Sequence, residues 1–220
     1  MVAVNDPSDE PLPRKYRSPK REQAALETKR RIRLAGETLF LRDGYVRTSM
    51  AAIAAQARVA EKTVYLAYST KAALLNDIIR VAVRGGEGAV PMAHSSSWPS
   101  MLNSASGGQL LERFAEENAS ILERTARFLA LGESAAMTDT ALATIRDYGH
   151  NATREDVLQV ATALHAKNAL APHLDVQQAA DIIFAFIAND NPYLRLTDEC
   201  GWTRDQYAEL LKRMLTTLLS

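Results

Sequence analysis

The sequence has few of the residues that form covalent or metal cross-links, and no long apolar run. One cysteine, Cys200, excludes an intrachain disulfide and a cysteine cluster for zinc or an iron–sulfur centre. Ten glycines in 220 residues exclude a collagen-like chain, and no stretch approaches the ~20 apolar residues that span a bilayer. The opening segment MVAVNDPSDEPLP lacks the apolar run of a secretory signal. We therefore expect a protein of the reducing cytoplasm.

The histidines do not form a metal or catalytic motif. His94, His150, His165 and His173 are never three or four residues apart, and no His-Glu-x-x-His is present. The sequence also lacks a glycine-rich phosphate loop after a strand and a nucleophile elbow around a serine. We expect no metal, no cofactor and no enzymatic activity.

What the sequence does contain is a globular composition with an uneven charge distribution. Hydrophobic residues make up 47% and charged residues 24%, with 26 of each sign. Residues 1–84 carry sixteen Lys and Arg against nine Asp and Glu, and residues 14–33 alone carry nine against two. A basic end attached to an acidic body is typical of a protein that binds a polyanion with one end. The alternative is a solvated basic tail on an ordinary domain.

Apolar residues recur at helical spacing along most of the chain, and no long segment alternates with period two. We therefore expect an all-α protein with a flexible basic arm at 1–25, a first domain at 26–86 and a second domain at 87–220. In the first domain the pattern predicts helices over 28–43, 51–57, 61–68 and from a cap at Thr70 onward. In the second domain a loop-rich stretch at 85–106 holds either a linker or a short interrupted helix. Apolar stripes follow over 110–129, 142–164, 176–188 and 203–219, the second with a kink near Gly149.

At residues 26–86 the sequence resembles the DNA-binding domain of the TetR family of bacterial transcriptional regulators. The resemblance rests on Asp43-Gly44-Tyr45, Thr48-Ser49, Ile53-Ala54, Thr63-Val64-Tyr65, Tyr68, Lys71 and Ala73-Leu74-Leu75. It implies a helix-turn-helix at 49–68 that binds a double-stranded DNA operator. It also implies that the helical second domain binds a small-molecule effector and forms a homodimer.

The resemblance and the physics of the major groove together nominate eight DNA-binding residues. They are Thr48, Ser49, Arg58, Glu61, Lys62, Thr63, Tyr65 and Lys71. Glu61–Tyr68 is the expected recognition helix, in which Lys62 and Thr63 meet bases or phosphates. Lys71 matches a common phosphate-binding lysine of the family, and its alternative is a free surface charge. Thr48 or Ser49 can cap the helix that follows, and Thr48 can also touch phosphate.

Three departures from the family pattern affect the DNA-reading region. Arg58 replaces the usual turn glycine, so it adopts a strained turn conformation or reshapes the turn. Ala60 weakens the cap of the recognition helix, and Glu61 either accepts from a cytosine amino group or complements the helix dipole. Leu66-Ala67 stands where the family often has a histidine or aromatic pair. The operator sequence of relatives therefore does not transfer to this chain.

Two further sets of residues are predicted in the second domain. The candidate effector-binding residues are Phe114, Asn118, Phe128, Met137, Ile145, Tyr148 and His165, and plain helix packing is the alternative for each. The candidate dimer interface consists of Ile183, Phe186, Ile187, Tyr207, Leu211, Met214, Leu215 and Leu218, with closure of the monomer core as the alternative. The resemblance thus implies a repressor released from a palindromic operator by a small, largely apolar effector, although repression or activation depends on where the operator lies relative to a promoter. The competing interpretation is a ligand-binding or catalytic helical bundle whose basic head is incidental.

Overall fold

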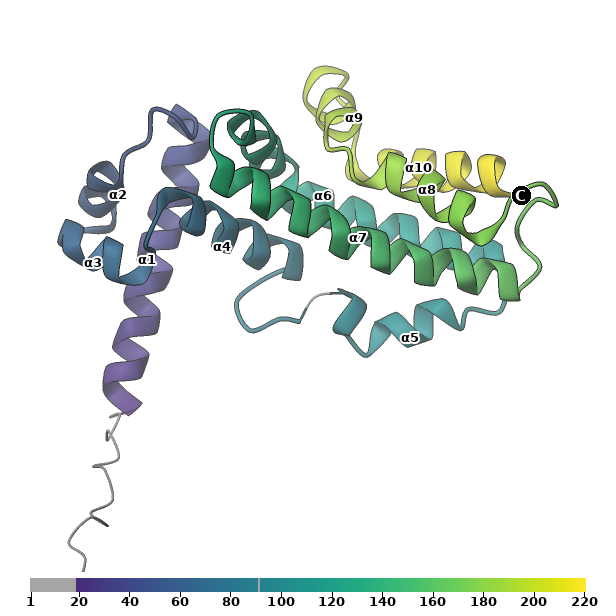
Figure 1. Ribbon diagram of the computed structural model, residues 1–220, viewed down its shortest axis with the longest axis horizontal. Coiled ribbons are helices and arrows are strands. Elements are labelled where there is room, and N and C mark those ends of the chain that lie inside the picture. Colours follow the sequence, from purple (N-terminus) through teal and green to yellow (C-terminus); the bar gives the residue numbers. More distant parts are fainter. Residues whose placement is uncertain (1–18, 91) are drawn as a thin grey trace, which may run out of the picture.

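The computed structural model describes residues 19–90 and 92–220, and the regular structure of this part of the chain is helical, as the sequence predicts (Figure 1). The first domain contains α1 (Pro19–Asp43), α2 (Met50–Ala57), α3 (Glu61–Ala67) and α4 (Lys71–Arg84). The second contains α5 (Ser97–Leu102), α6 (Gly107–Ala136), α7 (Thr140–Ala166), α8 (Val176–Ile187), α9 (Asn191–Leu194) and α10 (Arg204–Leu219). A 3₁₀ turn at Met92–His94 precedes α5, and a π-helical turn at Arg195–Glu199 follows α9.

Three features of the helices differ from the sequence prediction. Helix α1 begins at Pro19, so 19–25 are helical rather than part of a flexible arm, and 1–18 lie outside the described residues. Of the two alternatives for 85–106, the short helix is the one observed: α5 forms there, and its Trp98 and Met101 are buried in the second domain. Helix α6 continues to Ala136, and α7 passes through Gly149 without interruption.

The helix caps follow the local sequence signals. The backbone N–H groups of Ala52 and Ala73 donate to the hydroxyls of Ser49 and Thr70, at 3.1 and 3.0 Å. Reciprocal capping boxes open α8, between Asp175 and Gln178, and α10, between Thr203 and Gln206. These caps are local, which explains why spacing and residue type were enough to place them.

The core of the first domain extends across the predicted domain boundary. Helices α1–α4 bury a cluster that includes Ile32, Phe40, Leu74 and Ile78. Gly36 lets α1 approach α4 closely, since an added Cβ would lie 2.9 Å from Leu74 Cδ2. Four residues of the second domain, at the end of α6 and the start of α7, join this cluster: Phe128, Ala135, Ala136 and Leu142. We call this cluster the shared core.

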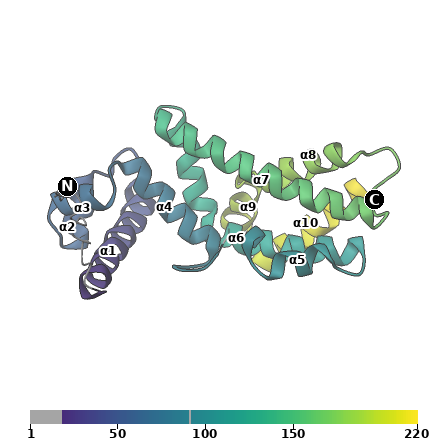
Figure 2. The same ribbon diagram turned by 60° about the horizontal axis from the view of Figure 1, so that its bottom comes forward.

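A separate core fills the second domain. Long helices α6 and α7 cross near the first domain and run side by side with α5, α8 and α10 (Figure 2). Their buried side chains include Leu111, Phe114, Val160, Ile183 and Leu215. This cluster, which we call the second-domain core, holds the body of the molecule together without the DNA-reading helices.

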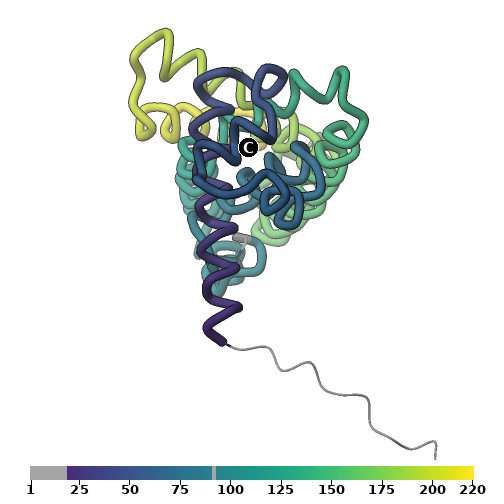
Figure 3. Tube along the Cα trace, turned by 90° about the vertical axis from the view of Figure 1, so that its left-hand side faces the viewer, coloured from purple at the N-terminus to yellow at the C-terminus, as the bar shows by residue number. Residues whose placement is uncertain are grey.

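The first domain forms one end of an elongated molecule, and the N-terminal half of α1 projects from it (Figures 1 and 3). Residues 19–27 of that helix are exposed, and they include Lys20 and Arg21. Among the described helices, none is both long enough and apolar enough to cross a membrane.

Candidate nucleic-acid interface

Helices α2 and α3 are joined by a turn over 58–60 that places Arg58 in the left-handed region. Its φ and ψ are 55° and 49°, a conformation that usually favours glycine. The guanidinium of Arg31, from α1, donates to the carbonyl oxygens of Ala57 and Arg58 and holds this turn. Of the two alternatives for Arg58, the strained left-handed conformation is therefore the one observed.

Helix α3 is anchored by one face and free on the other. Val64 is fully buried in the shared core, and Tyr68, just past the helix end, is buried with its hydroxyl 2.6 Å from Asp77 Oδ2. Lys62, Tyr65 and Leu66 are exposed, as a DNA-reading face requires. Ala60 gives no side-chain cap, in agreement with the weak cap predicted from the sequence.

The N-terminal turn of α3 is less free to bind phosphate than expected. The backbone N–H of Thr63 donates to the carbonyl of Ala60 at 2.8 Å, so that group is already used inside the protein. The Thr63 side chain is partly exposed, and Glu61 is exposed in the first turn, where its charge complements the helix dipole. A contact of either side chain with DNA remains a prediction.

Thr48 and Ser49 have different structural roles. Ser49 caps α2, whereas Thr48 is buried and donates to the carbonyl of Gly44 at 2.8 Å. Its second contact is with the carbonyl of Leu39, at 3.2 Å. The structure thus does not place the Thr48 side chain on the surface, because its hydroxyl ties the loop at 44–49 to the end of α1.

Lys71 is held inside the protein rather than standing free. Its ammonium lies 2.7 and 3.0 Å from the carbonyl oxygens of Tyr45 and Thr48, and 4.3 Å from the centre of the Tyr45 ring. Burial lowers the pKa of Lys71. The side chain therefore joins the start of α4 to the loop at 44–49, and a phosphate contact remains a prediction.

A polar contact that the sequence analysis missed joins the two domains at the same loop. The hydroxyl of Tyr45 donates to Asp139 Oδ2 at 2.8 Å, and Asp139 also caps α7 by accepting from the N–H of Ala141 at 3.0 Å. The hydrogen bond from Tyr45 lowers the pKa of Asp139. The capping role of Asp139 can be predicted from an Asp that precedes a helical apolar stripe. Its hydrogen bond with Tyr45 cannot, because the two residues are 94 positions apart in the sequence.

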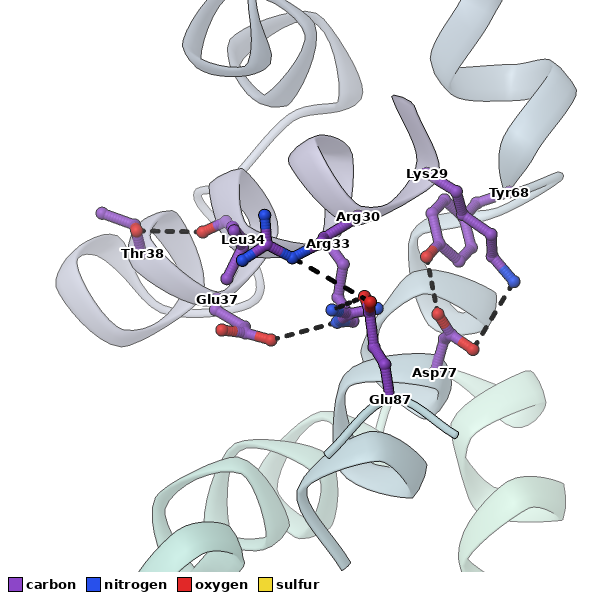
Figure 4. A network of polar contacts seen from close by, with 9 residues as sticks. All are labelled: Lys29, Arg30, Arg33, Leu34, Glu37, Thr38, Tyr68, Asp77 and Glu87. Carbon is purple, nitrogen blue, oxygen red and sulfur yellow. Dashed lines mark hydrogen bonds and ion pairs between the residues drawn. The ribbon is translucent and has the colours of Figure 1, made fainter. Parts of the chain in front are cut away.

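A second polar network fixes α1 against α4 and the segment after it (Figure 4). Arg33 is buried and paired with Glu37 and Glu87, although its Nε has no hydrogen-bond partner. Lys29 lies 3.6 Å from Asp77, which also accepts from Tyr68. The network forms only when the chain folds, since its residues come from α1, from α4 and from the segments just before and just after α4.

The seven candidate effector-binding residues do not gather around one cavity. The exposed ones are Met137 at 85%, Tyr148 at 77%, and His165. The others fall into different cores: Phe114 and Asn118 in or beside the second-domain core, Phe128 and Ile145 in or against the shared core. The Asn118 amide donates to the carbonyl of Phe114 at 2.8 Å, so it is satisfied within its own helix. Each of these residues therefore either packs in one of the two cores or is exposed, and together they do not line one site.

One cavity of the second domain lies between α5 and α6 and has a volume of about 170 Å³. It is lined by Ser97, Trp98, Met101, Glu112, Arg113, Glu116 and Glu117. The sequence analysis missed this cavity because its effector-binding candidates were all taken from Phe114 onward, beyond α5. Among the described residues, no group of three or more His, Cys, Asp or Glu could hold a metal ion.

The eight candidate dimer residues are divided by burial. Those buried in the second-domain core are Ile183, Tyr207, Leu211 and Leu215, which corrects their assignment to a surface. Their apolar stripe closes the monomer. Those left partly or largely exposed are Phe186, Ile187, Met214 and Leu218, the last at 41%. An interface between copies remains a prediction, and only the second group is available for it.

The short pair α2 and α3, packed on α1 and α4 with one face of α3 exposed, defines a helix-turn-helix DNA-binding protein. Residues 32–78 match the family model described as "Bacterial regulatory proteins, tetR family". This part of the chain is therefore a DNA-binding domain of the TetR type. The match supports a DNA-binding regulator over a bundle whose basic head is incidental.

Solved structures of the same fold cover nearly the whole chain. A putative TetR-family regulator from Syntrophomonas wolfei is 14% identical with a TM-score of 0.68, covering 87% of this chain and 94% of that one. NalD, the secondary repressor of the MexAB-OprM multidrug efflux pump in Pseudomonas aeruginosa, is 24% identical with a TM-score of 0.65, covering 89% and 98%. A putative fatty acid metabolism regulator of Clostridium perfringens is 15% identical with a TM-score of 0.64, covering 86% and 98%. No match is found among curated proteins.

Proposed function

We propose that this regulator is a cytoplasmic homodimeric repressor that leaves a palindromic operator when a small, largely apolar molecule binds its second domain. The observation that carries the proposal is the geometry of α3, which is anchored by Val64 and exposes Lys62, Tyr65 and Leu66. A single helix of this kind contacts too few base pairs for tight binding. Two copies related by a two-fold axis place it in two major-groove segments about one helical turn apart.

The proposed dimer face lies beside the residues that close the monomer. On α10, Tyr207, Leu211 and Leu215 point into the second-domain core. The next face of the same helix carries Leu210, Met214 and Leu218, four residues apart and partly or largely exposed. Helix α8, which contacts α10, adds the partly exposed Ile182 and Phe186. Two such helix pairs would bury an apolar interface of about 2,000 Å² or more.

The proposed effector site is the cavity between α5 and α6. Its floor includes the nearly buried Trp98 and Met101, and its rim carries Arg113 and three glutamates. A volume of about 170 Å³ is below the ~300–1,000 Å³ of most ligand sites, so a larger effector requires α5 to move away from α6. Such a movement can reach the DNA-reading helices through α6, whose far end lies in the shared core.

Selection of bound sequences from a random pool of duplex DNA tests the operator. We expect one enriched motif with two-fold symmetry, and an affinity that falls steeply with salt because phosphate contacts release counterions. Enrichment of no sequence, or of a single half-site bound by a monomer, would overturn the proposal.

The second experiment tests the effector and uses the operator DNA found by the selection. A panel of apolar compounds is screened by the thermal unfolding of the protein, and stabilising compounds are then tested for release of the DNA. Substitution Met101→Gln, which adds a polar group to the floor of the cavity, should abolish the response while leaving DNA affinity unchanged. A response that survives this substitution would remove the site from the α5–α6 cavity.

A further inference from the structure

The direction in which each side chain of α3 points follows from helix geometry and burial. Successive residues of an α-helix are rotated by about 100°. Val64, Ala67 and Tyr68 share the face that packs on the domain, since Val64 and Tyr68 are buried and Ala67 is partly buried. Lys62 and Leu66 then fall on the opposite side, within about 30° of the outward direction. Their exposure agrees, and Leu66 is 79% exposed.

The flanks of the same helix carry different residues. Thr63 and Tyr65 are rotated by about 90–110° from the buried face, one to each side. The major groove is about 12 Å wide and admits one α-helix, so the outward face meets base edges while the flanks meet the sugar–phosphate walls. This arrangement assigns base reading to Lys62 and Leu66, and wall contacts to Thr63 and Tyr65.

The chemistry of the two outward residues selects their bases. The Lys62 ammonium is a donor, and guanine presents two acceptors, O6 and N7, in the major groove. Leu66 cannot form a side-chain hydrogen bond, and the apolar group exposed in that groove is the 5-methyl of thymine. Four residues of helix span about 6 Å, which corresponds to about two base-pair steps of 3.4 Å.

We propose that Lys62 and Leu66 are the specificity-determining pair, reading a guanine and a thymine about two base pairs apart in each half-site. The proposal rests on the DNA-binding function proposed above. Single exposed leucines are common on protein surfaces, so the exposure of Leu66 alone would carry little weight. Its weight comes from a position opposite the buried face of the helix that the fold presents to DNA.

The test compares thymine with deoxyuridine, which lacks the 5-methyl group and pairs in the same way. In the selected operator, each half-site thymine is replaced in turn. For the unmodified protein we expect one replacement to weaken binding about fourfold per half-site, the contribution of one buried methyl group. For Leu66→Ala that replacement should have no effect. For Lys62→Met, replacing the partner guanine by 7-deazaguanine should likewise lose its effect.

The controls separate this proposal from the function on which it rests. Leu158→Ala removes a leucine that is 40% exposed on α7, outside the DNA-reading domain, and should keep the full response to deoxyuridine. Leu66→Ala should keep its helical circular dichroism, because the side chain packs against little. If every deoxyuridine is neutral for the unmodified protein, or if Leu66→Ala responds equally, the proposal is overturned while DNA binding stands. Failure to select any DNA would instead overturn the proposed function.

Discussion

At the scale of single residues, the helix-turn-helix depends on side chains that donate hydrogen bonds to the backbone of its turn and of the loop before α2. Arg58 occupies the left-handed region with a φ of 55°, and Arg31 donates to the carbonyls of Ala57 and Arg58 itself. Lys71 fixes the preceding loop in a similar way, by donating to backbone oxygens. Both of these cations, which the sequence nominates for DNA binding, thus take part in structural hydrogen bonds: the Arg58 carbonyl accepts from Arg31, and the Lys71 ammonium donates to the carbonyls of Tyr45 and Thr48.

Arg58→Gly is expected to separate stability from DNA binding. A non-glycine residue in this conformation costs about 1–2 kcal/mol, and glycine loses about 0.5–1 kcal/mol through its freer unfolded chain. We therefore expect the free energy of unfolding to rise by up to about 1 kcal/mol in denaturant titrations. DNA affinity should fall, because a positive charge at the turn is lost. Asn168→Gly, at a φ of 52° far from DNA, is the matched control and should leave affinity unchanged.

Lys71→Met is expected to weaken both the fold and the complex. It keeps the aliphatic stem but removes charged hydrogen bonds to the loop at 44–49, at a cost of about 1–3 kcal/mol in the free energy of unfolding. Affinity for all DNA sequences should fall together, since the loop carries the start of α2. A phosphate contact would also flatten the salt dependence by about one unit. An unchanged slope would assign the entire effect to the loop, and an unchanged stability would contradict the structural role.

At the scale of elements, α10 shows how one helix can serve two interfaces. Its inner face closes the second-domain core, while Leu210, Met214 and Leu218 form an adjacent row with partial exposure. An apolar stripe wider than one packing face is typical of a helix that also contacts another surface. This division accounts for the mixed outcome of the sequence prediction, in which half of the candidate dimer residues are internal.

Leu218→Glu is expected to dissociate the dimer without unfolding the protomer. The side chain is 41% exposed, so a carboxylate stays hydrated in the monomer but would be desolvated in an apolar interface. Sedimentation velocity at micromolar concentration should show dimers for the unmodified protein and monomers for the variant. Leu158→Glu, at 40% exposure on α7, is the matched control and should remain dimeric. A monomeric unmodified protein would refute the dimer, and with it the palindromic operator.

At the scale of the whole molecule, the two domains are not independent units. Phe128, Ala135, Ala136 and Leu142 complete the core of the DNA-binding domain, and the Tyr45–Asp139 hydrogen bond crosses the same boundary. A domain that shares its core with its neighbour is expected to unfold with it. The same contacts make the position of α3 sensitive to the end of α6 and the start of α7.

Phe128→Ala is expected to damage DNA binding from within the second domain. Removing a buried phenylalanine costs about 3–5 kcal/mol, and here the cavity would open under α4. Denaturant titration followed by circular dichroism should give a lower midpoint and loss of operator binding. Phe114→Ala, in the second-domain core, is the comparison: it should cost similar stability but reduce affinity less under conditions where both variants are folded. Equal losses of affinity at equal stability would contradict a direct link between Phe128 and the DNA-reading helices.

Much of the fold and part of the site could be predicted because their causes are local. Ser49, Thr70, Asp175 and Thr203 cap helices through partners within three residues. The family resemblance placed Arg58 at the turn position where glycine is usual, and of its two alternatives the structure shows the left-handed conformation. The effector candidates failed for the opposite reason, because periodicity shows that a residue faces apolar surroundings without showing which core it enters.

The sequence by itself determined the all-helical class and the helix-turn-helix, because helical period and residue type act over a few residues. Only the tertiary structure decided that Thr48 and Lys71 are tied to backbone carbonyls, that Phe128 belongs to the DNA-binding domain, and that four apolar residues of α8 and α10 are internal. These depend on pairs of segments far apart in the chain, such as Tyr45 and Asp139, which only packing brings within hydrogen-bonding distance.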